Sequence, residues 1–223
     1  MKKLLSLLLA AFILVGCSFK PSPSFESPNQ LLQYLRSVAS LSIEVPGTSS
    51  YQPVCSTMSI NEGKKYWLTA AHCVVGVGEK FFILGDDAYP VLIDATNDLA
   101  ILKTQKVSLP GRALAKSAPT YGDKIILIGY PGPLEMKEAS FAFGWVSHPK
   151  LKLMDNPWDP FLNHPFMVIQ TAAAPGNSGS GILNSRGEVV SVLQASWGRG
   201  FSSMSLSAPF ENITVYKQYW TEK

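Results

Sequence analysis

Three polar residues of this chain, each within a short motif, have the side chains that nucleophilic catalysis by a serine needs. His72 lies in Leu-Thr-Ala-Ala-His-Cys, Asp98 in Asn-Asp-Leu-Ala-Ile-Leu, and Ser178 in Pro-Gly-Asn-Ser-Gly-Ser-Gly. A serine hydroxyl is a weak nucleophile until an imidazole takes its proton, and a buried carboxylate holds that imidazole in the required tautomer. The residue types therefore predict a base at His72, its orienting carboxylate at Asp98 and a nucleophile at Ser178.

Each motif also has a purely structural interpretation. Gly-Asn-Ser-Gly has an ordinary turn composition, and Asn-Asp before an apolar run also predicts a turn that leads into a strand. A lone histidine in an apolar strand, such as His72, is usually a core residue whose hydrogen bonds are satisfied. Asp94 is the alternative carboxylate, whereas His148 and His164 lack a surrounding motif. The joint occurrence of the three motifs favours the catalytic interpretation.

The glycines beside Ser178 predict a second catalytic element. Acyl transfer builds negative charge on a carbonyl oxygen, which is stabilised by backbone N–H groups aimed at that point. Gly176 and Gly179 tolerate backbone conformations that a side chain forbids, so the turn can direct two amides into one concavity. We expect the N–H groups of Gly176 and Ser178 to form this oxyanion hole.

The three motifs, in this order, resemble those of the chymotrypsin-like (trypsin-fold) serine peptidases, over roughly residues 37 to 220. The segments 168–179 and 205–209 resemble the HtrA-type bacterial branch. The resemblance implies an all-β fold of two six-stranded antiparallel barrels with a short C-terminal helix. It also implies a serine endopeptidase that forms an acyl-enzyme and uses no metal or other cofactor. Ser180 departs from the family, which usually has a second glycine there.

The resemblance also indicates where the primary substrate pocket lies. Ala172 would lie near its floor, and Ser196, Trp197 and Gly198 would form one wall that pairs with the substrate backbone. No aspartate stands near Ala172, and Ala195 precedes Ser196, so neither the trypsin-like preference for cations nor the histidine-based preference for glutamate is expected. We expect a small or medium apolar residue before the cleaved bond.

The first 16 residues have the composition of a secretory signal, with two lysines followed by an apolar stretch over 4–15. The segment Leu14-Val15-Gly16-Cys17 resembles the bacterial lipobox, which implies cleavage before Cys17 and acylation of that cysteine. The protein would then be anchored to a bacterial membrane, facing the periplasm or the exterior. An ordinary signal peptide with a chance cysteine is the alternative. Residues 17–29, rich in Ser and Pro, predict an extended tether.

If Cys17 carries a lipid, two of the three cysteines remain. We expect Cys55 and Cys73 to pair, because disulfides persist in an oxidising compartment. The bridge would fix the strand end that carries His72. Two free buried thiols are the alternative.

Beyond the tether, residues 30–223 are predicted to form one peptidase domain. Leucines at helical spacing predict a short helix over 30–41 that lies against the first barrel. Strand-like segments, with 124–129 as the last, assign the first barrel to 37–130, the second to about 138–210 and a closing helix to 211–220. The aromatic loop at 154–165 would rim the substrate cleft or cover the barrel end.

Composition excludes some classes of function. The apolar fraction of 46% argues against disorder, and a net charge of +3 with scattered basic residues gives little support for nucleic-acid binding.

The sequence predicts a lipid-anchored endopeptidase with peptide or protein substrates. A catalytically weak peptide-binding or scaffold lipoprotein on the same fold is the alternative. Asn177 stands where zymogen-type relatives have an aspartate, so activation by cleavage is not expected.

Overall fold

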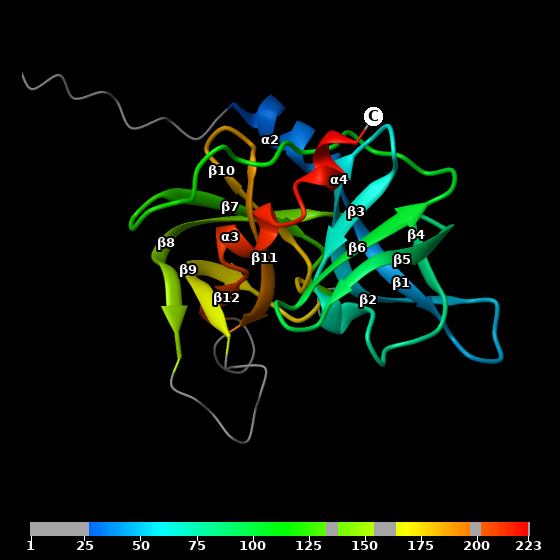
Figure 1. Cartoon of the computed structure of the whole chain (residues 1–223). Helices are drawn as coiled ribbons and strands as arrows, with labels where there is room; N and C mark the ends of the chain where they lie inside the picture. The colour runs from blue at the N-terminus through cyan, green and yellow to red at the C-terminus, as the bar shows by residue number, and fades with distance from the viewer. Residues whose placement is uncertain (1–26, 133–137, 154–163, 197–201, 223) are drawn as a thin grey trace, which may run out of the picture.

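Two closed antiparallel β-barrels form the fold, with the first on the right of Figure 1 and the second on the left. The computed structural model describes residues 27–132, 138–153, 164–196 and 202–222. Strands β1 to β6 close the first barrel in the order β1-β2-β3-β6-β5-β4, and β7 to β12 close the second in the order β10-β11-β12-β9-β8-β7. The predicted pair of six-stranded barrels is confirmed.

The strands of the first barrel are β1 Val38–Glu44, β2 Tyr51–Asn61, β3 Tyr66–Thr69, β4 Phe81–Ile83, β5 Asp86–Asp94 and β6 Leu99–Thr104. Those of the second are β7 Lys124–Gly129, β8 Ser140–Lys152, β9 Pro165–Ala173, β10 Gly181–Asn184, β11 Val189–Ser196 and β12 Ser202–Ser207. The short helices are α2 Pro28–Leu35, η1 Ala71–Cys73, α3 Phe210–Thr214 and α4 Gln218–Thr221.

The assignment of residues 124–129 to the first barrel is wrong. This strand, β7, pairs with β8 and β10 of the second barrel, and the first barrel closes without it by pairing β1 with β4. Ile125 and Leu127 pack in the core of the second barrel, whereas Ile126 and Ile128 join a cluster formed by both barrels. Because both faces of β7 are apolar, its sequence pattern does not indicate which barrel it belongs to.

The N-terminal helix is shorter and earlier than predicted. Helix α2 ends at Leu35, and Val38 already begins β1, so the predicted tether and helix boundaries are both wrong. Pro28 provides a preset first helical residue, and the Gln30 side chain accepts the Ser27 backbone N–H at 2.9 Å. The Tyr34 ring of this helix lies against Gly187 of the second barrel, and Tyr34 also joins an apolar cluster formed by residues of both barrels.

The predicted C-terminal helix over 211–220 is interrupted. Helices α3 and α4 are separated by a tight turn in which Tyr216 and Lys217 donate backbone hydrogen bonds to the residues three positions earlier. The turn directs the Tyr216 hydroxyl onto Asp94 of the first barrel. The C-terminal segment therefore crosses from one barrel to the other.

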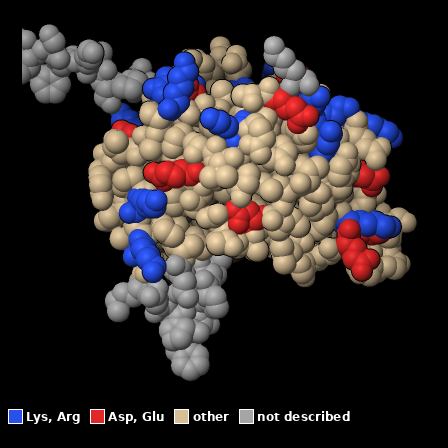
Figure 2. Space-filling view, viewed as in Figure 1, with Lys and Arg blue, Asp and Glu red and all other residues tan. Residues whose placement is uncertain are grey.

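No helix within the described part of the chain is long and apolar enough to cross a bilayer. The predicted signal and lipobox, residues 1–17, lie outside the described residues. Figure 2 shows Lys and Arg side chains scattered among Asp and Glu side chains on the face in view.

Candidate active site

His72 and Asp98 meet through two hydrogen bonds. The Nδ1 atom of His72 lies 2.8 Å from Oδ2 of Asp98, and the His72 backbone N–H donates to Oδ1 at 2.8 Å. Asp98 is only 2% exposed. Its carboxylate thus fixes the position and the tautomer of the imidazole, which places the proton-accepting nitrogen at Nε2.

A network of side chains holds the turn that carries Asp98. Asp98 has φ +48°, a left-handed conformation that residues with a side chain rarely adopt. Asp94 accepts the backbone N–H groups of Thr96 and Asn97, both at 3.1 Å, and the Asn97 side-chain amide at 2.6 Å. The Gln194 side-chain amide donates to the carbonyls of Asn97 and Asp98 at 2.6 and 3.2 Å. These bonds stabilise the strained backbone.

The C-terminal segment reaches the same turn. The Tyr216 hydroxyl donates to Asp94, and the Asn212 side chain donates to Oδ1 of Asn97 at 2.7 Å. Burial alone would raise the pKa of Asp94, but the hydrogen bonds from Tyr216 and Asn97 hold this pKa below its usual range. Burial and the bond to Asp94 raise the pKa of Tyr216 to about 12. Asp94 therefore supports the turn, while Asp98 contacts His72.

Ser178 lies in the turn between β9 and β10, at the seam where the second barrel meets the first. Its Oγ is 3.5 Å from the carbonyl oxygen of Gln194, the residue whose side chain holds the Asp98 turn. The Ser178 carbonyl accepts the backbone N–H of Ser56 at 2.8 Å, and the Ser56 carbonyl accepts the hydroxyl of Thr69, three residues before His72, at 2.8 Å. The three predicted catalytic residues thus belong to one connected set of contacts.

Two backbone hydrogen bonds hold the peptide units on either side of Gly176 and Asn177. The Pro175 carbonyl accepts the Gly132 N–H at 2.8 Å, and the Asn177 carbonyl accepts the Ser180 N–H at 2.9 Å. Because C=O and N–H point in opposite directions within a trans peptide unit, these bonds fix where the N–H groups of Gly176 and Ser178 point. Neither of those two N–H groups donates a hydrogen bond to any residue that the structure describes. Gly176, at φ +91°, is in a conformation suited to glycine.

Sequence reasoning missed Ser56, which follows Cys55 in β2. Its hydroxyl donates to the Gly176 carbonyl at 2.9 Å and accepts the Tyr130 N–H at 2.8 Å. Ser56 is fully buried, so both bonds are shielded from water. Together with its backbone bond to Ser178, these contacts clamp the turn of Ser178 to the first barrel. No local pattern around Ser56 in the sequence predicts this role.

Ser180, which stands where the family usually has a glycine, fits because another glycine lies next to it. A Cβ atom at Gly129 would lie 1.7 Å from Oγ of Ser180 and 2.7 Å from Oγ of Ser56. Gly129 therefore makes room for two buried serines beside the turn of Ser178. The Ser180 hydroxyl has no hydrogen-bond partner among the described residues.

A disulfide joins Cys55 of β2 to Cys73 of η1, as predicted. It connects the strand that contains Ser56 to the short helix that contains His72. In the chain-entropy model, a bridge of this span contributes about 3 kcal/mol to stability.

The predicted substrate pocket is described in part. Ala172 lines a cavity of about 180 Å³ with Phe141 and Asn177 among its other walls. Ser196 ends β11 and pairs with Ser205 of β12. Trp197 and Gly198 lie outside the described residues, as do residues 154–163 of the predicted rim.

The two other histidines lie elsewhere. The His148 ring packs edge-on against Tyr121 with centroids 5.5 Å apart, and His164 packs against Phe166 at 4.1 Å. These contacts are those of structural aromatic residues.

Comparisons with known proteins show the family of this chain. A family model described as a trypsin-like peptidase domain matches residues 55–192. A probable periplasmic serine endoprotease, DegP-like, of Hahella chejuensis is 32% identical over 153 residues, which are 66% of this chain and 31% of that protein. Its counterpart in Pseudomonas savastanoi pv. phaseolicola is 28% identical over 196 residues, 82% of this chain and 39% of that protein. The chain thus spans about a third of the length of these curated relatives.

Solved structures give the same fold. The HtrA-type protease AlgW with a decapeptide has a TM-score of 0.69 at 19% identity, covering 87% of this chain and 67% of that one. AlgW with a tripeptide also has a TM-score of 0.69, at 22% identity, covering 90% and 64%.

Proposed function

The chain belongs to the trypsin-like peptidase family, and from this premise we propose that it is an extracytoplasmic bacterial serine endopeptidase with His72, Asp98 and Ser178 as its catalytic residues. The observation that carries the proposal is the double hydrogen bond between His72 and the buried Asp98, beside the Ser178 turn. The names of the curated relatives, which describe periplasmic serine endoproteases, support both the reaction and the location.

The reaction proceeds in two halves. The Ser178 Oγ attacks the carbonyl carbon of the substrate while Nε2 of His72 takes its proton. The oxygen that becomes negative accepts hydrogen bonds from the N–H groups of Gly176 and Ser178. The intermediate then breaks the C–N bond, and His72 returns the proton to the leaving amine. Water repeats the attack on the acyl-enzyme, again through His72, and releases Ser178.

Asp98 stabilises the positive charge that forms on His72 and fixes the orientation of its ring. When His72 takes a proton, its imidazolium lies against an ionised carboxylate 2.8 Å away, which stabilises it. Asp98 orients the ring and does not take a proton from it.

The substrates in this proposal are peptides or proteins. The AlgW structures, solved with bound peptides, show this fold with such ligands. The small Ala172 beside its cavity supports a small or medium apolar residue before the cleaved bond. The same proposal includes an anchor at Cys17, supported by the lipobox-like sequence Leu14-Val15-Gly16-Cys17.

Cleavage of a peptide library tests the activity. The wild-type chain should cleave it, and Ser178→Ala and His72→Ala should each lower kcat/KM by at least about 10³-fold with an unchanged melting temperature. A Ser178→Ala protein that cleaves at the wild-type rate would contradict the proposal. A folded wild-type protein that binds peptides without cleaving them would favour the scaffold alternative.

A further inference from the structure

The outer face of strand β8 carries three exposed aromatic side chains in a row. Phe141, Phe143 and Trp145 alternate along the strand and are 42%, 42% and 51% exposed. Side chains two residues apart in a strand share one face. Ala142 and Val146, on the opposite face of the strand, pack in the core of the second barrel, so the three rings point away from that core. In Figure 1, β8 lies at the left edge of this barrel.

The same outer face continues across the neighbouring strands. Trp145 pairs with Lys124 of β7 on one side and with Gln170 of β9 on the other, and Gln170 pairs with Met204 of β12. Paired residues of antiparallel strands place their side chains on the same face. Lys124 is exposed, and Met204 is 38% exposed. We call the following set of exposed side chains the aromatic face: Phe141, Phe143, Trp145, Met204 and Lys124.

The strands that form the aromatic face carry charge of one sign. Strands β7, β8, β9 and β12 contain three lysines and no aspartate or glutamate. The lysines are Lys124 and, at the far end of β8, Lys150 and Lys152, and all three are exposed. Asp123 and Glu138 lie just before β7 and β8, and the Asp123 carboxylate accepts a backbone N–H at 2.7 Å. The surface is therefore both apolar and cationic.

Helix α2 lies next to the aromatic face. It contacts β7, and its leucines pack on the apolar cluster that includes Ile126 and Ile128 of that strand. Ile126 pairs with Phe143, and Ile128 pairs with Phe141. The helix and the exposed rings therefore lie on the outer face of two adjacent strands.

The proposed anchor is within reach of this surface. Cys17 stands ten residues before Ser27, which caps the start of α2. Ten residues span at most about 35 Å when fully extended. An acyl chain on Cys17 would therefore hold the domain close enough to a bilayer for the aromatic face to touch it.

We propose that the aromatic face rests on the surface of an anionic lipid bilayer, with its rings among the headgroups and its lysines against their phosphates. Tryptophan is enriched at membrane–water interfaces, and lysines add attraction to an anionic surface. The inference rests on the anchor in the proposed function and adds an orientation of the domain to it.

The charge of this surface favours a bilayer over a second copy of the chain. A two-fold interface brings the same surface of both copies together. The lysines of β7 and β8 would then meet lysines, with no carboxylate from these strands between them. Anionic headgroups supply the missing opposite charge.

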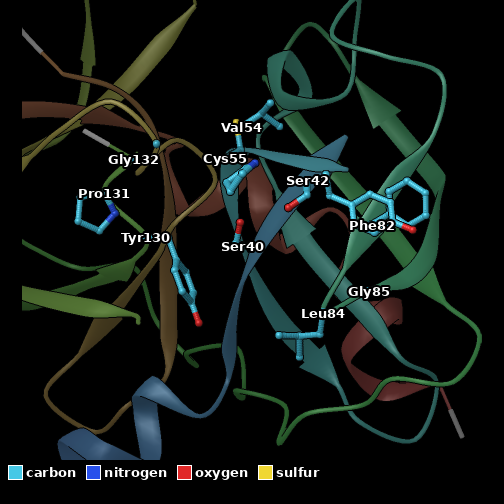
Figure 3. Close-up of a pocket in the computed structure, with 13 residues that line it drawn as sticks. Ser40, Ser42, Val54, Cys55, Phe82, Leu84, Gly85, Tyr130, Pro131 and Gly132 are labelled. Atoms are coloured by element: carbon cyan, nitrogen blue, oxygen red, sulfur yellow. The ribbon is translucent and has the colours of Figure 1, made fainter. Parts of the chain in front are cut away.

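A bilayer on the aromatic face leaves the seam between the barrels open. A cavity of about 540 Å³ lies there, between Tyr130 and the first barrel (Figure 3). None of the described residues that line it belongs to β8, β9 or β12. Phe141, in contrast, also lines the smaller cavity of Ala172. The contact would thus hold the proposed substrate pocket near the bilayer without filling the seam.

Vesicle binding tests the inference on a chain that carries no acyl group. The mature chain, residues 17–223 with Cys17→Ser, is mixed with vesicles of phosphatidylglycerol and phosphatidylcholine in equal parts, or of phosphatidylcholine alone. Binding should be at least about 10-fold tighter to the anionic vesicles, and should weaken at least about fivefold between about 50 and about 500 mM salt. No binding to the anionic vesicles, or equal binding to both kinds, would overturn the inference.

Matched variants of aromatic side chains locate the contact. Trp145→Ala and Phe143→Ala should each weaken binding by about 10-fold, because each removes apolar surface that the headgroups cover. Tyr89→Ala is the control, because Tyr89 is 42% exposed, as Phe143 is, but lies on β5 of the first barrel. Its binding should equal that of the parent chain. Unchanged binding in Trp145→Ala and Phe143→Ala would contradict the proposed surface.

A pair of lysine variants tests the electrostatic part. Lys124→Gln should weaken binding to the anionic vesicles by about fivefold. Lys106→Gln makes the same change in net charge at an exposed position that follows β6 of the first barrel, and it should have no effect. Equal losses in the two variants would show that net charge, rather than this surface, governs binding, and would overturn the inference.

Sedimentation without lipid distinguishes a second copy from a bilayer. The parent chain and Trp145→Ala should have the same oligomeric state. An oligomer of the parent chain that Trp145→Ala disperses would show that the aromatic face joins copies of the chain, which would refute the membrane contact.

Cleavage of a soluble peptide separates this inference from the proposed function. Trp145→Ala should cleave at the rate of the parent chain, because Trp145 lies on the outer face of the barrel. A chain that binds anionic vesicles but cleaves no peptide refutes only the peptidase. An active chain that does not bind these vesicles refutes only the membrane contact.

Discussion

The base and the nucleophile of the proposed site are held in different ways. His72 and Asp98 both belong to the first barrel and bond directly to each other. The turn of Ser178 belongs to the second barrel, yet Ser56 of the first barrel holds both its Gly176 and its Ser178 carbonyl. The His72–Asp98 contact therefore lies within one barrel, with Gln194 of the second barrel bonded to the turn of Asp98, whereas the proposed oxyanion donors are held by contacts between the two barrels.

The largest expected effect contrasts the two carboxylates near the base. Asp98→Asn should lower kcat by about 10³ to 10⁴-fold, because an amide stabilises the wrong imidazole tautomer and cannot stabilise the imidazolium. Asp94→Asn should cost far less activity, since Asp94 bonds to the turn and Tyr216. Rates of peptide cleavage check both variants. A greater loss in Asp94→Asn would show that the wrong carboxylate is assigned.

Ser56→Ala tests whether Ser56 clamps the turn of Ser178 to the first barrel. This change leaves the Gly176 carbonyl and the Tyr130 N–H without their partner, so kcat should fall by about 10 to 100-fold with little change in KM. Ser59→Ala is the matched control, because Ser59 is buried on the same strand and donates to the Leu109 carbonyl. Both variants should lose about 1–3 kcal/mol of stability. Equal kcat in the two would refute the clamp.

Removing the disulfide tests whether the first barrel positions His72 without the Cys55–Cys73 bridge. Replacement of Cys55 and Cys73 by alanine should lower the free energy of unfolding by about 3 kcal/mol, measured by denaturant titration. The His72–Asp98 contact does not involve these sulfurs, so activity of the folded variant should persist. Complete inactivity of a folded double variant would show that the bridge itself positions His72.

The contact of the C-terminal segment with the first barrel predicts a pH effect. The pKa of Asp94 is lowered, so its bond to Tyr216 adds stability at neutral pH that is lost as pH falls through that lowered pKa. The pKa of Tyr216 is raised to about 12, so the same bond is lost as pH rises toward that value. Melting temperatures of wild type and Tyr216→Phe should differ at neutral pH and converge at both extremes. A pH-independent difference would contradict this.

The smallest effect on catalysis is expected at the anchor. Cys17→Ser should abolish incorporation of labelled palmitate and partitioning into detergent, because the proposed acylated cysteine is gone. The catalytic residues lie far along the chain, so peptidase activity should remain. Recovery of the wild-type protein without lipid, beginning at a residue other than Cys17, would leave a secreted enzyme without an anchor.

Sequence reasoning succeeded for the overall fold and for the disulfide. The resemblance of short local motifs to a known family implied the two closed barrels, and Cys55 and Cys73 were expected to pair in an oxidising compartment. It failed where pairing is set by distant residues. The apolar β7 could join either barrel, and nothing near Ser56 in the sequence indicates that its hydroxyl reaches Gly176, 120 residues away.

The interrupted C-terminal helix is a similar case. Its composition allows one helix, but the Tyr216 hydroxyl bonds to Asp94 of the first barrel and the Trp220 ring N–H to the Arg112 carbonyl at 3.0 Å. These tertiary contacts override the local helical preference.

The central claim is that Ser178 is a nucleophile activated by His72 and Asp98. The most direct measurement is mass-spectrometric mapping of the adduct formed when the full chain reacts with a fluorophosphonate, compared with His72→Ala and Asp98→Asn. The account predicts one adduct, on Ser178, formed rapidly in wild type and at least about 10³-fold more slowly in both variants. An adduct on another residue, or labelling of His72→Ala at the wild-type rate, would contradict it.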